Sequence, residues 1–277
     1  MIPFDFDYVK PESIQEAISI FRQWDAEGKE PKYFCGGTEI ITMARLSQLH
    51  TKGIIDIKGI PDCRLLEWQN DLLVIGSAIS LAQLEAVQYF PLLSRVCNRI
   101  ADHTSRCKIT IGGNICGKIM YREAILPLLV ANAKLHIATD DGIKQVSIHD
   151  VIEREVQLLP HEFLLKIAVD RQVTTLPYLS EKRTRIDRIG YPIVSIAAIH
   201  NQGEVHIAFS GVCSFPFRSE KVEQALNDQT LSLEKRISSA IQEFPESVME
   251  DHHASASFRK FIVHNLMLDT IERFERA

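Results

Sequence analysis

Two short glycine motifs are the part of this sequence best suited to hold a ligand. Gly36-Gly37-Thr38 and Gly112-Gly113-Asn114 each follow an apolar segment that predicts a strand. Glycine permits positive φ and lets a ligand approach the backbone closely. Consecutive backbone N–H groups at such a turn, next to the start of a helix, can hold a phosphate. Two motifs of this kind predict a site for an extended ligand with a pyrophosphate at its centre.

A plain tight turn is the alternative interpretation of either motif taken alone, because paired glycines are common in turns. Neither motif is a Walker loop, since no Lys-Ser or Lys-Thr follows the glycines. Neither matches the GxGxxG pattern of a Rossmann NAD site. The residues by themselves therefore predict a phosphate-binding protein of mixed helix and strand content, and no more specific function.

Composition narrows the class of protein. Of the 277 residues, 45% are hydrophobic and 24% are charged, which is typical of a globular protein. The net charge of -5 argues against general nucleic-acid binding. No apolar stretch approaches the roughly 20 residues of a membrane helix, and the first residues lack the pattern of a signal peptide. Six scattered cysteines without a CxxC pair are typical of a reducing compartment. We therefore expect a cytoplasmic protein of about two domains that binds neither nucleic acid nor membrane.

Helices and strands alternate in the first half, which is the pattern of an α/β arrangement. Apolar spacing over 13–24 predicts a helix, and Gly28 is expected to end it. A second helix is predicted after Gly37. In that second helix the residues expected to face the core are Ile40, Ile41, Ala44 and Leu49. Strands are predicted over 32–35, 54–57, 64–69, 72–75, 134–139, 143–147 and 163–169, and helices from Ser80, from Pro91 and over 122–131.

The second half has a different character. Strands predicted over 192–200 and 204–210 flank a hairpin turn, and three helical patterns begin near Glu220, Ser232 and His253. Strands followed by a block of helices indicate a smaller α+β domain. We place the domain boundary near Val173, which gives domains 1–172 and 173–277.

At the glycine motifs the sequence resembles the FAD-binding medium subunit of the molybdenum hydroxylases, a family that includes xanthine dehydrogenase, aldehyde oxidase-type enzymes and aerobic carbon monoxide dehydrogenase. Segment 35–40 resembles the first flavin loop of the family and segment 110–115 resembles the second. Weaker markers follow the family order at 75–81, at Gly211-Val212 with Pro216 and Arg218, and at 255–259. The resemblance covers essentially the whole chain.

The resemblance implies an α+β fold whose first part is α/β. It implies an FAD-binding domain of the PCMH or vanillyl-alcohol-oxidase type, with subdomains at about 1–57 and 58–172. A small C-terminal α+β domain of the carbon monoxide dehydrogenase flavoprotein type would follow at 173–277. Some relatives carry a cysteine-rich insertion for an additional iron–sulfur cluster. This sequence has none, so we expect FAD and no metal in this chain.

The resemblance also implies a set of flavin contacts. The pyrophosphate and adenosine side would be lined by Lys32, Tyr33, Phe34, Cys35, Gly36, Gly37, Thr38, Glu39 and Ile40. Thr110, Gly113 and Asn114 would hold the pyrophosphate and ribityl region, and Glu123 would add a hydrogen bond. Leu165 would touch the isoalloxazine, Lys182 would lie near the flavin, and Tyr191 would lie over its ring. Glu39 and Glu123 stand where many members have Asp.

Several of these residues have a structural alternative. Cys35 is interpreted as a buried small apolar residue beside the loop, in preference to a redox thiol. Lys182 is alternatively part of an exposed basic strand end, and Tyr191 is alternatively a core aromatic whose hydroxyl is satisfied. His252-His253 is interpreted as a solvated turn, not a ligand pair. Cys97, Cys107 and Cys116 match no common metal site.

The implied function is that of an electron-transfer flavoprotein subunit of a xanthine dehydrogenase-like complex. A large partner subunit would hold molybdopterin, a small partner subunit would hold [2Fe–2S] clusters, and NAD+ would accept the electrons from FAD. A purine is the expected substrate of the complex. Carbon monoxide, an aldehyde or a nicotinate-type heterocycle are the alternatives. A nucleotide-binding scaffold without redox function is the alternative from another class.

Overall fold

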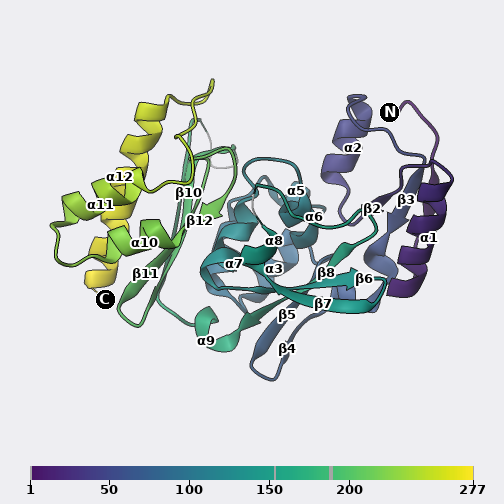
Figure 1. The fold of residues 1–277 in the computed structure, drawn as a ribbon, viewed down its shortest axis with the longest axis horizontal. Helices are drawn as coiled ribbons and strands as arrows, with labels where there is room; N and C mark the ends of the chain where they lie inside the picture. Colours follow the sequence, from purple (N-terminus) through teal and green to yellow (C-terminus); the bar gives the residue numbers. More distant parts are fainter. Residues whose placement is uncertain (1, 153, 187–189, 277) are drawn as a thin grey trace. The chain divides into compact units, whose positions relative to one another are not determined.

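The computed structural model describes residues 2–152, 154–186 and 190–276, and the chain divides into two compact units (Figure 1). Unit 1 consists of Met1–Leu84, His103–Gly117 and Ala133–Val169. Unit 2 consists of Glu85–Asp102, Lys118–Asn132 and Asp170–Ala277. The chain therefore enters unit 2 twice before its C-terminal part completes that unit. The domains 1–172 and 173–277 stay a prediction, because the compact units group the chain in another way.

A small parallel sheet forms the first part of unit 1. Its strands are β1 (Asp7–Val9), β3 (Gly53–Asp56) and β2 (Lys32–Phe34), in that spatial order. The predicted first helix is confirmed as α1 (Ile14–Ala26), and it buries Ala17, Ile18 and Phe21. Ser13 caps its start by accepting a hydrogen bond from the Glu16 N–H, and Gly28 follows its end with φ of 71°. Helix α2 (Thr38–Arg45) begins directly after Gly37.

Two of the residues expected to face inward from α2 do not. Ala44 is buried, but Ile41 is 40% exposed. The helix ends at Arg45 because Ser47 adopts a positive φ of 57°, so Leu49 lies beyond it and outside its periodicity. The predicted inward stripe was thus too long, and α2 presents part of its apolar surface outward.

A second sheet of five strands completes the framework of unit 1. Its order is β4 (Leu66–Gln69), β5 (Leu72–Gly76), β8 (Phe163–Asp170), β6 (Lys134–Thr139) and β7 (Gly142–Ser147). The strands predicted over 64–69 and 72–75 and over 134–139 and 143–147 are confirmed, and each pair forms an antiparallel hairpin, β4–β5 and β6–β7. Short helices lie beside this sheet: α5 (His103–Arg106), α6 (Ile111–Cys116), α8 (Ile148–Val151) and the start of α3 (Leu81–Val87), with 3₁₀ turns at Ile57–Gly59 and Pro61–Arg64.

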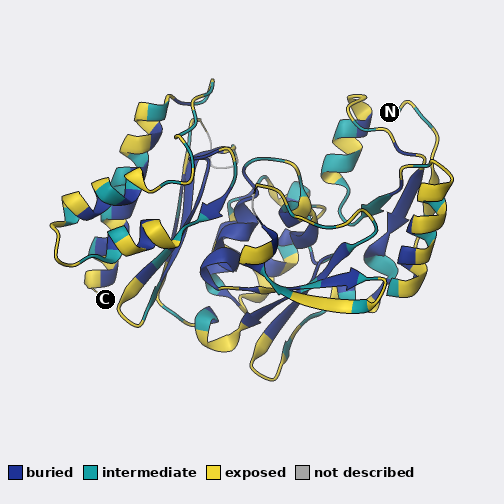
Figure 2. Cartoon of the chain, in the orientation of Figure 1, coloured by how far each residue is buried: buried dark blue, intermediate teal, exposed yellow. Residues whose placement is uncertain are grey.

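Unit 2 is built on an antiparallel sheet. Its order is β12 (Phe217–Arg218), β11 (Glu204–Ser210), β10 (Pro192–Asn201) and β9 (Tyr178–Thr184). The helices that accompany it are α4 (Pro91–Asn98), α7 (Leu126–Val130), α9 (Arg171–Thr174), α10 (Glu220–Asn227), α11 (Leu233–Gln242) and α12 (Ala256–Glu275). Both α12 and α7 pack against β10, which is dark blue along most of its length in Figure 2. Burial of both faces explains why β10 is apolar at nearly every position.

Charged side chains close the open edge of this sheet. Among the described strands β9 pairs only with β10, so its outer carbonyls lack a strand partner there. Arg99 donates a hydrogen bond to the Lys182 carbonyl at 2.9 Å, and Arg95 donates to the Ser180 carbonyl at 3.4 Å. Both arginines also lie 3.7 Å from carboxylate oxygens of Glu181. The edge is thereby blocked against pairing with another chain.

Two polar networks involve residues of the weaker family markers in the second half of the chain. Arg259 is fully buried and donates to the carbonyls of Ile193 and Gly211, and to Asp251. Arg218 donates to Glu223 at 2.6 Å and approaches His206 at 2.8 Å. Burial alone would raise the pKa of Glu223, but its hydrogen bonds from His206 and Arg218 outweigh burial and lower that pKa. These marker residues hold unit 2 together.

Within the described ranges, no helix combines the length and the apolar character that crossing a membrane requires. The longest of them, α12, has charged residues near both of its ends.

Candidate functional site

The first glycine motif lies where the parallel strand β2 ends. The carboxyl edge of parallel strands is the usual place for ligands in α/β folds. Gly37 has φ of 70°, in the left-handed region, and serves as the cap residue of α2 without a side-chain hydrogen bond. A Cβ on Gly37 would lie 2.0 Å from the Phe34 ring. Both the backbone angle and the packing therefore require glycine at this position.

Backbone N–H groups in this turn are available to a ligand. In the described part of the chain, the N–H groups of Gly36, Gly37 and Thr38 have no hydrogen-bond acceptor. Gly36 and Gly37 are partly exposed and Thr38 is exposed. The first helical bond of α2 runs from Ile41 N to the Gly37 carbonyl at 2.8 Å. Free N–H groups at a helix start attract anions, so this turn can bind a phosphate.

The second glycine motif differs from the prediction. Residues Ile111–Cys116 form the short helix α6, not the end of a strand, and neither of its glycines has a positive φ. Thr110 caps this helix, and its hydroxyl accepts a hydrogen bond from the Gly113 N–H at 3.2 Å. Gly112 N donates to the Ser77 carbonyl and Asn114 N donates to the Thr110 carbonyl. These N–H groups are thus engaged by the protein, and the expectation that both motifs offer free N–H groups was wrong for the second.

The glycines of the second motif serve two different purposes. A Cβ on Gly112 would lie 2.6 Å from the Ser77 Cβ, so this glycine allows close packing. A Cβ on Gly113 would meet Thr110 Oγ1 at 2.9 Å and no other described heavy atom within 4 Å. Gly113 is also exposed. It therefore leaves open space in which a ligand can approach the backbone.

The structure brings the two motifs together within unit 1. A Cβ on Gly36 would lie 2.0 Å from the Lys108 carbonyl oxygen, directly before the second motif. A Cβ on Gly117 would lie 2.9 Å from Glu39 Oε2. The turn with free N–H groups thus lies next to the segment that carries the second motif. Residues far apart in the sequence form one candidate site for an extended anion.

Cys35 behaves as the packing residue that the sequence suggested. It packs against the core cluster that contains Cys63. Burial raises the pKa of the Cys35 thiol to about 12 and that of the Cys63 thiol to about 11. Both thiols are therefore protonated and unreactive near neutral pH.

Leu165 lies in the same core cluster and its side chain is fully buried. Its carbonyl accepts a hydrogen bond from the Ser77 N–H at 3.0 Å. Because Ser77 in turn accepts from Gly112, Leu165 supports the second motif from the core. A contact between its side chain and a flavin ring stays a prediction.

Two predicted residues of unit 2 form a buried ion pair. Lys182 Nζ lies 2.8 Å from Glu123 Oε2 and also donates to the Arg99 carbonyl at 2.9 Å. Lys182 is 4% exposed, so the alternative of an exposed strand end was wrong. Burial raises the pKa of the Glu123 carboxyl, and the Lys182 ammonium opposes that shift. Each residue is the main polar partner of the other.

Tyr191 is not a core aromatic, because it is 57% exposed. Its ring stacks on Tyr121 with the ring centres 4.9 Å apart and an angle of 17° between the planes. The outer face of Tyr191 is therefore accessible to a flat ligand.

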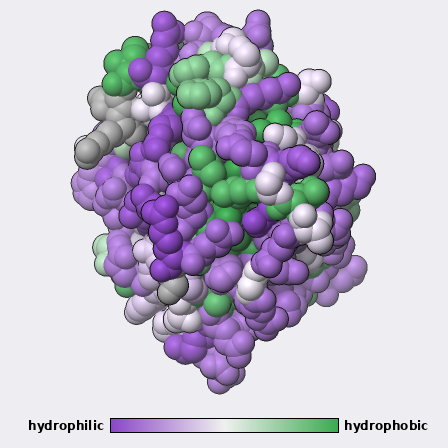
Figure 3. Space-filling view, turned by 90° about the vertical axis from the view of Figure 1, so that its left-hand side faces the viewer, coloured by the Kyte–Doolittle hydropathy of each residue, from purple (hydrophilic) through white to green (hydrophobic). Residues whose placement is uncertain are grey.

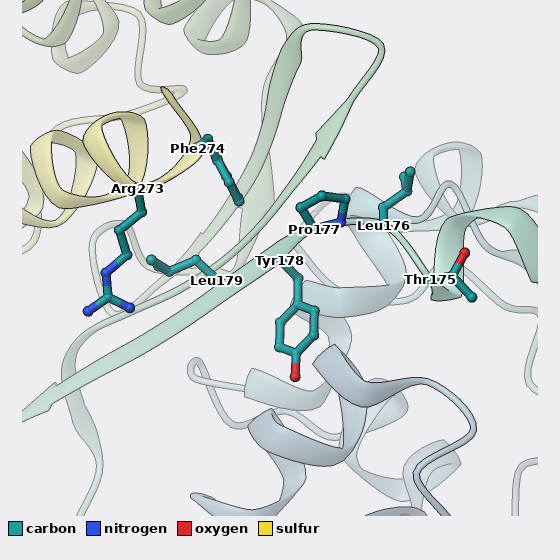
Figure 4. A pocket seen from close by; sticks show the side chains of 7 residues that line it. All are labelled: Thr175, Leu176, Pro177, Tyr178, Leu179, Arg273 and Phe274. Carbon is teal, nitrogen blue, oxygen red and sulfur yellow. The ribbon is translucent and has the colours of Figure 1, made fainter. Parts of the chain in front are cut away.

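A pocket of about 410 Å³ lies elsewhere in unit 2. Its lining residues are Thr175, Leu176, Pro177, Tyr178, Leu179, Arg273 and Phe274 (Figure 4). None of the predicted site residues is among them. Its walls are mainly apolar, with Arg273 at one side.

The sequence analysis missed one residue that contacts the first motif. Lys58 Nζ donates a hydrogen bond to the Cys35 carbonyl at 2.7 Å. It also lies 2.8 Å from Asp56 Oδ1. An acidic residue inside the otherwise apolar segment 54–57, followed closely by a lysine, was the available signal.

Comparison with known proteins agrees with this geometry. Residues 4–171 match the family model described as "FAD binding domain in molybdopterin dehydrogenase". A putative xanthine dehydrogenase FAD-binding subunit XdhB of Escherichia coli is 24% identical over 92% of this chain and 89% of its own length. A glyceraldehyde dehydrogenase medium chain of Sulfolobus acidocaldarius is 26% identical over 97% of this chain and 98% of its own length.

A solved structure of carbon monoxide dehydrogenase from Hydrogenophaga pseudoflava matches with a TM-score of 0.86. The match covers 96% of each chain at 23% sequence identity, and it confirms the predicted α+β fold. Both glycine motifs lie inside the segment that the family model covers. The chain therefore belongs to the family of FAD-binding domains of the molybdopterin dehydrogenases.

Proposed function

We propose that this chain is the FAD-binding electron-transfer subunit of a xanthine dehydrogenase-like molybdenum hydroxylase. In this proposal it passes electrons from [2Fe–2S] clusters of a small partner subunit, through FAD, to NAD+. A large partner subunit holds molybdopterin and oxidises a purine, hypoxanthine or xanthine. The observation that carries the flavin part is the row of unengaged N–H groups at Gly36, Gly37 and Thr38, in a turn whose Gly36 packs against the backbone of Lys108 and Thr110.

The residues of unit 1 fit the pyrophosphate of FAD. A dianionic group suits N–H dipoles at a helix start better than a basic patch in a chain with a net charge of -5. Gly113 lets the ligand approach the protein backbone closely. Asn114 and Glu39 supply polar side chains near Gly113. When bound, FAD supplies the transfer of electrons, singly or as a hydride, and the protein supplies binding and orientation.

In unit 2 we assign a ring contact to Tyr191, whose accessible face suits a flat conjugated ring. The Lys182 ammonium is engaged by Glu123 and by the Arg99 carbonyl. We therefore assign Lys182 a supporting role, in which it holds the Glu123 carboxylate in place. Hydride transfer needs no general base, so no further catalytic group is required of this chain.

The partner and substrate assignments rest on the relatives. The XdhB relative is named as a xanthine dehydrogenase subunit and aligns over most of both chains, which favours a purine. An aldehyde, carbon monoxide or a nitrogen heterocycle are the alternatives, and the glyceraldehyde relative supports the first of these. Figure 3 shows a mainly hydrophilic face on which apolar side chains gather near the middle. Such a gathering suits contact with a partner subunit.

The test is to purify the chain, record its visible spectrum with and without added FAD, and titrate it anaerobically with NADH. A flavin spectrum that bleaches supports both the flavin and the NAD+ assignment. If a flavin spectrum is present but NADH does not change it, the flavin assignment is supported and NAD+ is refuted as the acceptor. If no flavin binds even after FAD is added, the scaffold alternative replaces the proposal.

A further inference from the structure

Lys58 contacts the two residues that lead into the first glycine motif. Its Nζ donates to the Cys35 carbonyl at 2.7 Å, and it lies 4.5 Å from the centre of the Phe34 ring. The same ring would collide with a Cβ on Gly37. The ammonium, the ring and the glycine therefore pack as one group at the end of β2.

Asp56 holds Lys58 in this position. Its carboxylate is almost completely buried, and Oδ1 accepts a hydrogen bond from the Lys58 backbone N–H at 3.0 Å and forms an ion pair with Nζ at 2.8 Å. Oδ2 accepts from the Tyr8 hydroxyl at 2.6 Å. Hydrogen bonding to Asp56 raises the pKa of Tyr8 to about 12, so the hydroxyl keeps its proton near neutral pH. The ammonium is thus tied to β1 and β3, and its charge is balanced by Asp56.

The Cys35 carbonyl and the Gly36 N–H belong to one planar peptide unit and point in opposite directions. A hydrogen bond that fixes the carbonyl therefore fixes the direction of the N–H. The Gly36 N–H has no acceptor among the described residues. Glycine has broad backbone freedom, so without Lys58 this peptide can rotate and turn its carbonyl oxygen toward an anion.

We infer that Lys58 is a positioning residue for the pyrophosphate: it holds the Cys35 carbonyl away so that the Gly36 N–H faces the bound dinucleotide. This inference rests on the proposed flavin site. Because Asp56 balances the ammonium, Lys58 acts through the orientation of the peptide and adds little net charge to the site.

The test compares Lys58→Met with Lys58→Arg and with the matched control Lys52→Met. Lys52 is exposed, and its side chain forms no hydrogen bond or ion pair with the described residues. The probes are FAD, inorganic pyrophosphate and riboflavin, which lacks the pyrophosphate. Dissociation constants are measured together with thermal unfolding of each unliganded variant.

We expect Lys58→Met to weaken FAD and pyrophosphate binding about tenfold, or about 1.4 kcal/mol, and to leave riboflavin binding unchanged. Lys58→Arg retains a donor for the Cys35 carbonyl and should keep most of the affinity, and Lys52→Met should match the wild type. In nitrogen-15 spectra, pyrophosphate should shift the Gly36 amide signal in the wild type and much less in Lys58→Met.

The inference is overturned if Lys58→Met binds pyrophosphate like the wild type, or if it loses riboflavin affinity equally. An equal loss in Lys52→Met also overturns it, because the effect would then come from charge in general. A wild type that binds pyrophosphate but not FAD refutes the proposed function, and the pyrophosphate data then decide the role of Lys58. A wild type that binds neither probe refutes both.

Discussion

Gly112 and Gly113 are neighbours in one helix, yet adding a side chain at each should have different effects, on stability at Gly112 and on ligand binding at Gly113. A Cβ on Gly112 would lie 2.6 Å from the Ser77 Cβ and 2.7 Å from the Ser77 carbonyl oxygen. Ser77 is tied by its own N–H to the core strand β8, so the backbone has to move. A Cβ on Gly113 would meet the Thr110 hydroxyl, which is the end of a rotatable side chain.

These distances set the expected sizes of the two effects. Overpacking costs about 1–3 kcal/mol, and replacing glycine by alanine within a helix returns about 0.5–1 kcal/mol. Gly112→Ala should therefore lose about 1–2 kcal/mol of stability. At about 2–4 °C per kcal/mol, that lowers the Tm by about 2–8 °C. For Gly113→Ala the two terms are close to equal, and the Tm of the unliganded protein should stay within about 2 °C of the wild type.

Ligand binding should follow the reverse order. Gly113→Leu fills the open space above the first turn of α6 and should weaken FAD binding at least about tenfold, or about 1.4 kcal/mol. The methyl group added in Gly112→Ala would point toward Ser77 and away from that space. The folded fraction of this variant should therefore keep wild-type affinity for FAD. The assay combines flavin content, measured by visible absorbance per protein, with thermal unfolding of the unliganded variants. Wild-type flavin content in Gly113→Leu, or wild-type stability in Gly112→Ala, would refute the reasoning.

Three further predictions concern stability and are checked by denaturant unfolding. Gly37→Ala forces a left-handed residue and a collision with Phe34, so a loss of at least about 1–2 kcal/mol is expected; an unchanged midpoint would contradict this. Lys182→Met leaves the buried Glu123 carboxylate unpaired and should cost about 3–5 kcal/mol. The double variant with Glu123→Gln should recover much of that loss, and strict additivity would rule out the coupling. The lowered pKa of Glu223 gives stability that is present above its ordinary pKa of 4.5 and is lost as the pH falls through the folded value. Glu223→Gln should therefore be less stable at pH 7 and show a flatter acid limb; a parallel acid limb would contradict the assignment.

Strong local patterns made most of the elements predictable. The spacing of Ala17, Ile18 and Phe21, together with a capping serine, predicted α1 almost to its ends. The second glycine motif was not predictable in the same way, because a short apolar run around 109–115 suits a strand as well as a helix. Thr110 caps the segment as a helix, and Gly112 packs on Ser77. The second of these contacts is tertiary and cannot be inferred from the local sequence.

The site itself was predictable in its segments and less so in its contacts. The first motif could be found from the sequence, because the backbone freedom of its glycines does not depend on distant contacts. Lys58 could not be found in this way, since its role depends on the pairing of β2 with β3. Lys182 resembled an exposed basic residue, because its partner Glu123 lies 59 positions earlier in the chain. A local sequence pattern does not reveal an ion pair between residues that are far apart in the chain.

The interleaving of the two units has a consequence for how the protein is made. Segments Glu85–Asp102 and Lys118–Asn132 belong to unit 2, but they leave the ribosome long before its sheet strands β9 to β12. Leu92, Leu93 and Val96, which are buried in the finished protein, have no sheet to cover them during that interval. Synthesis at about 5–20 residues per second leaves this apolar surface uncovered for several seconds. The nascent chain is therefore a natural client for a chaperone, and a C-terminal fragment made by itself would lack part of its own core.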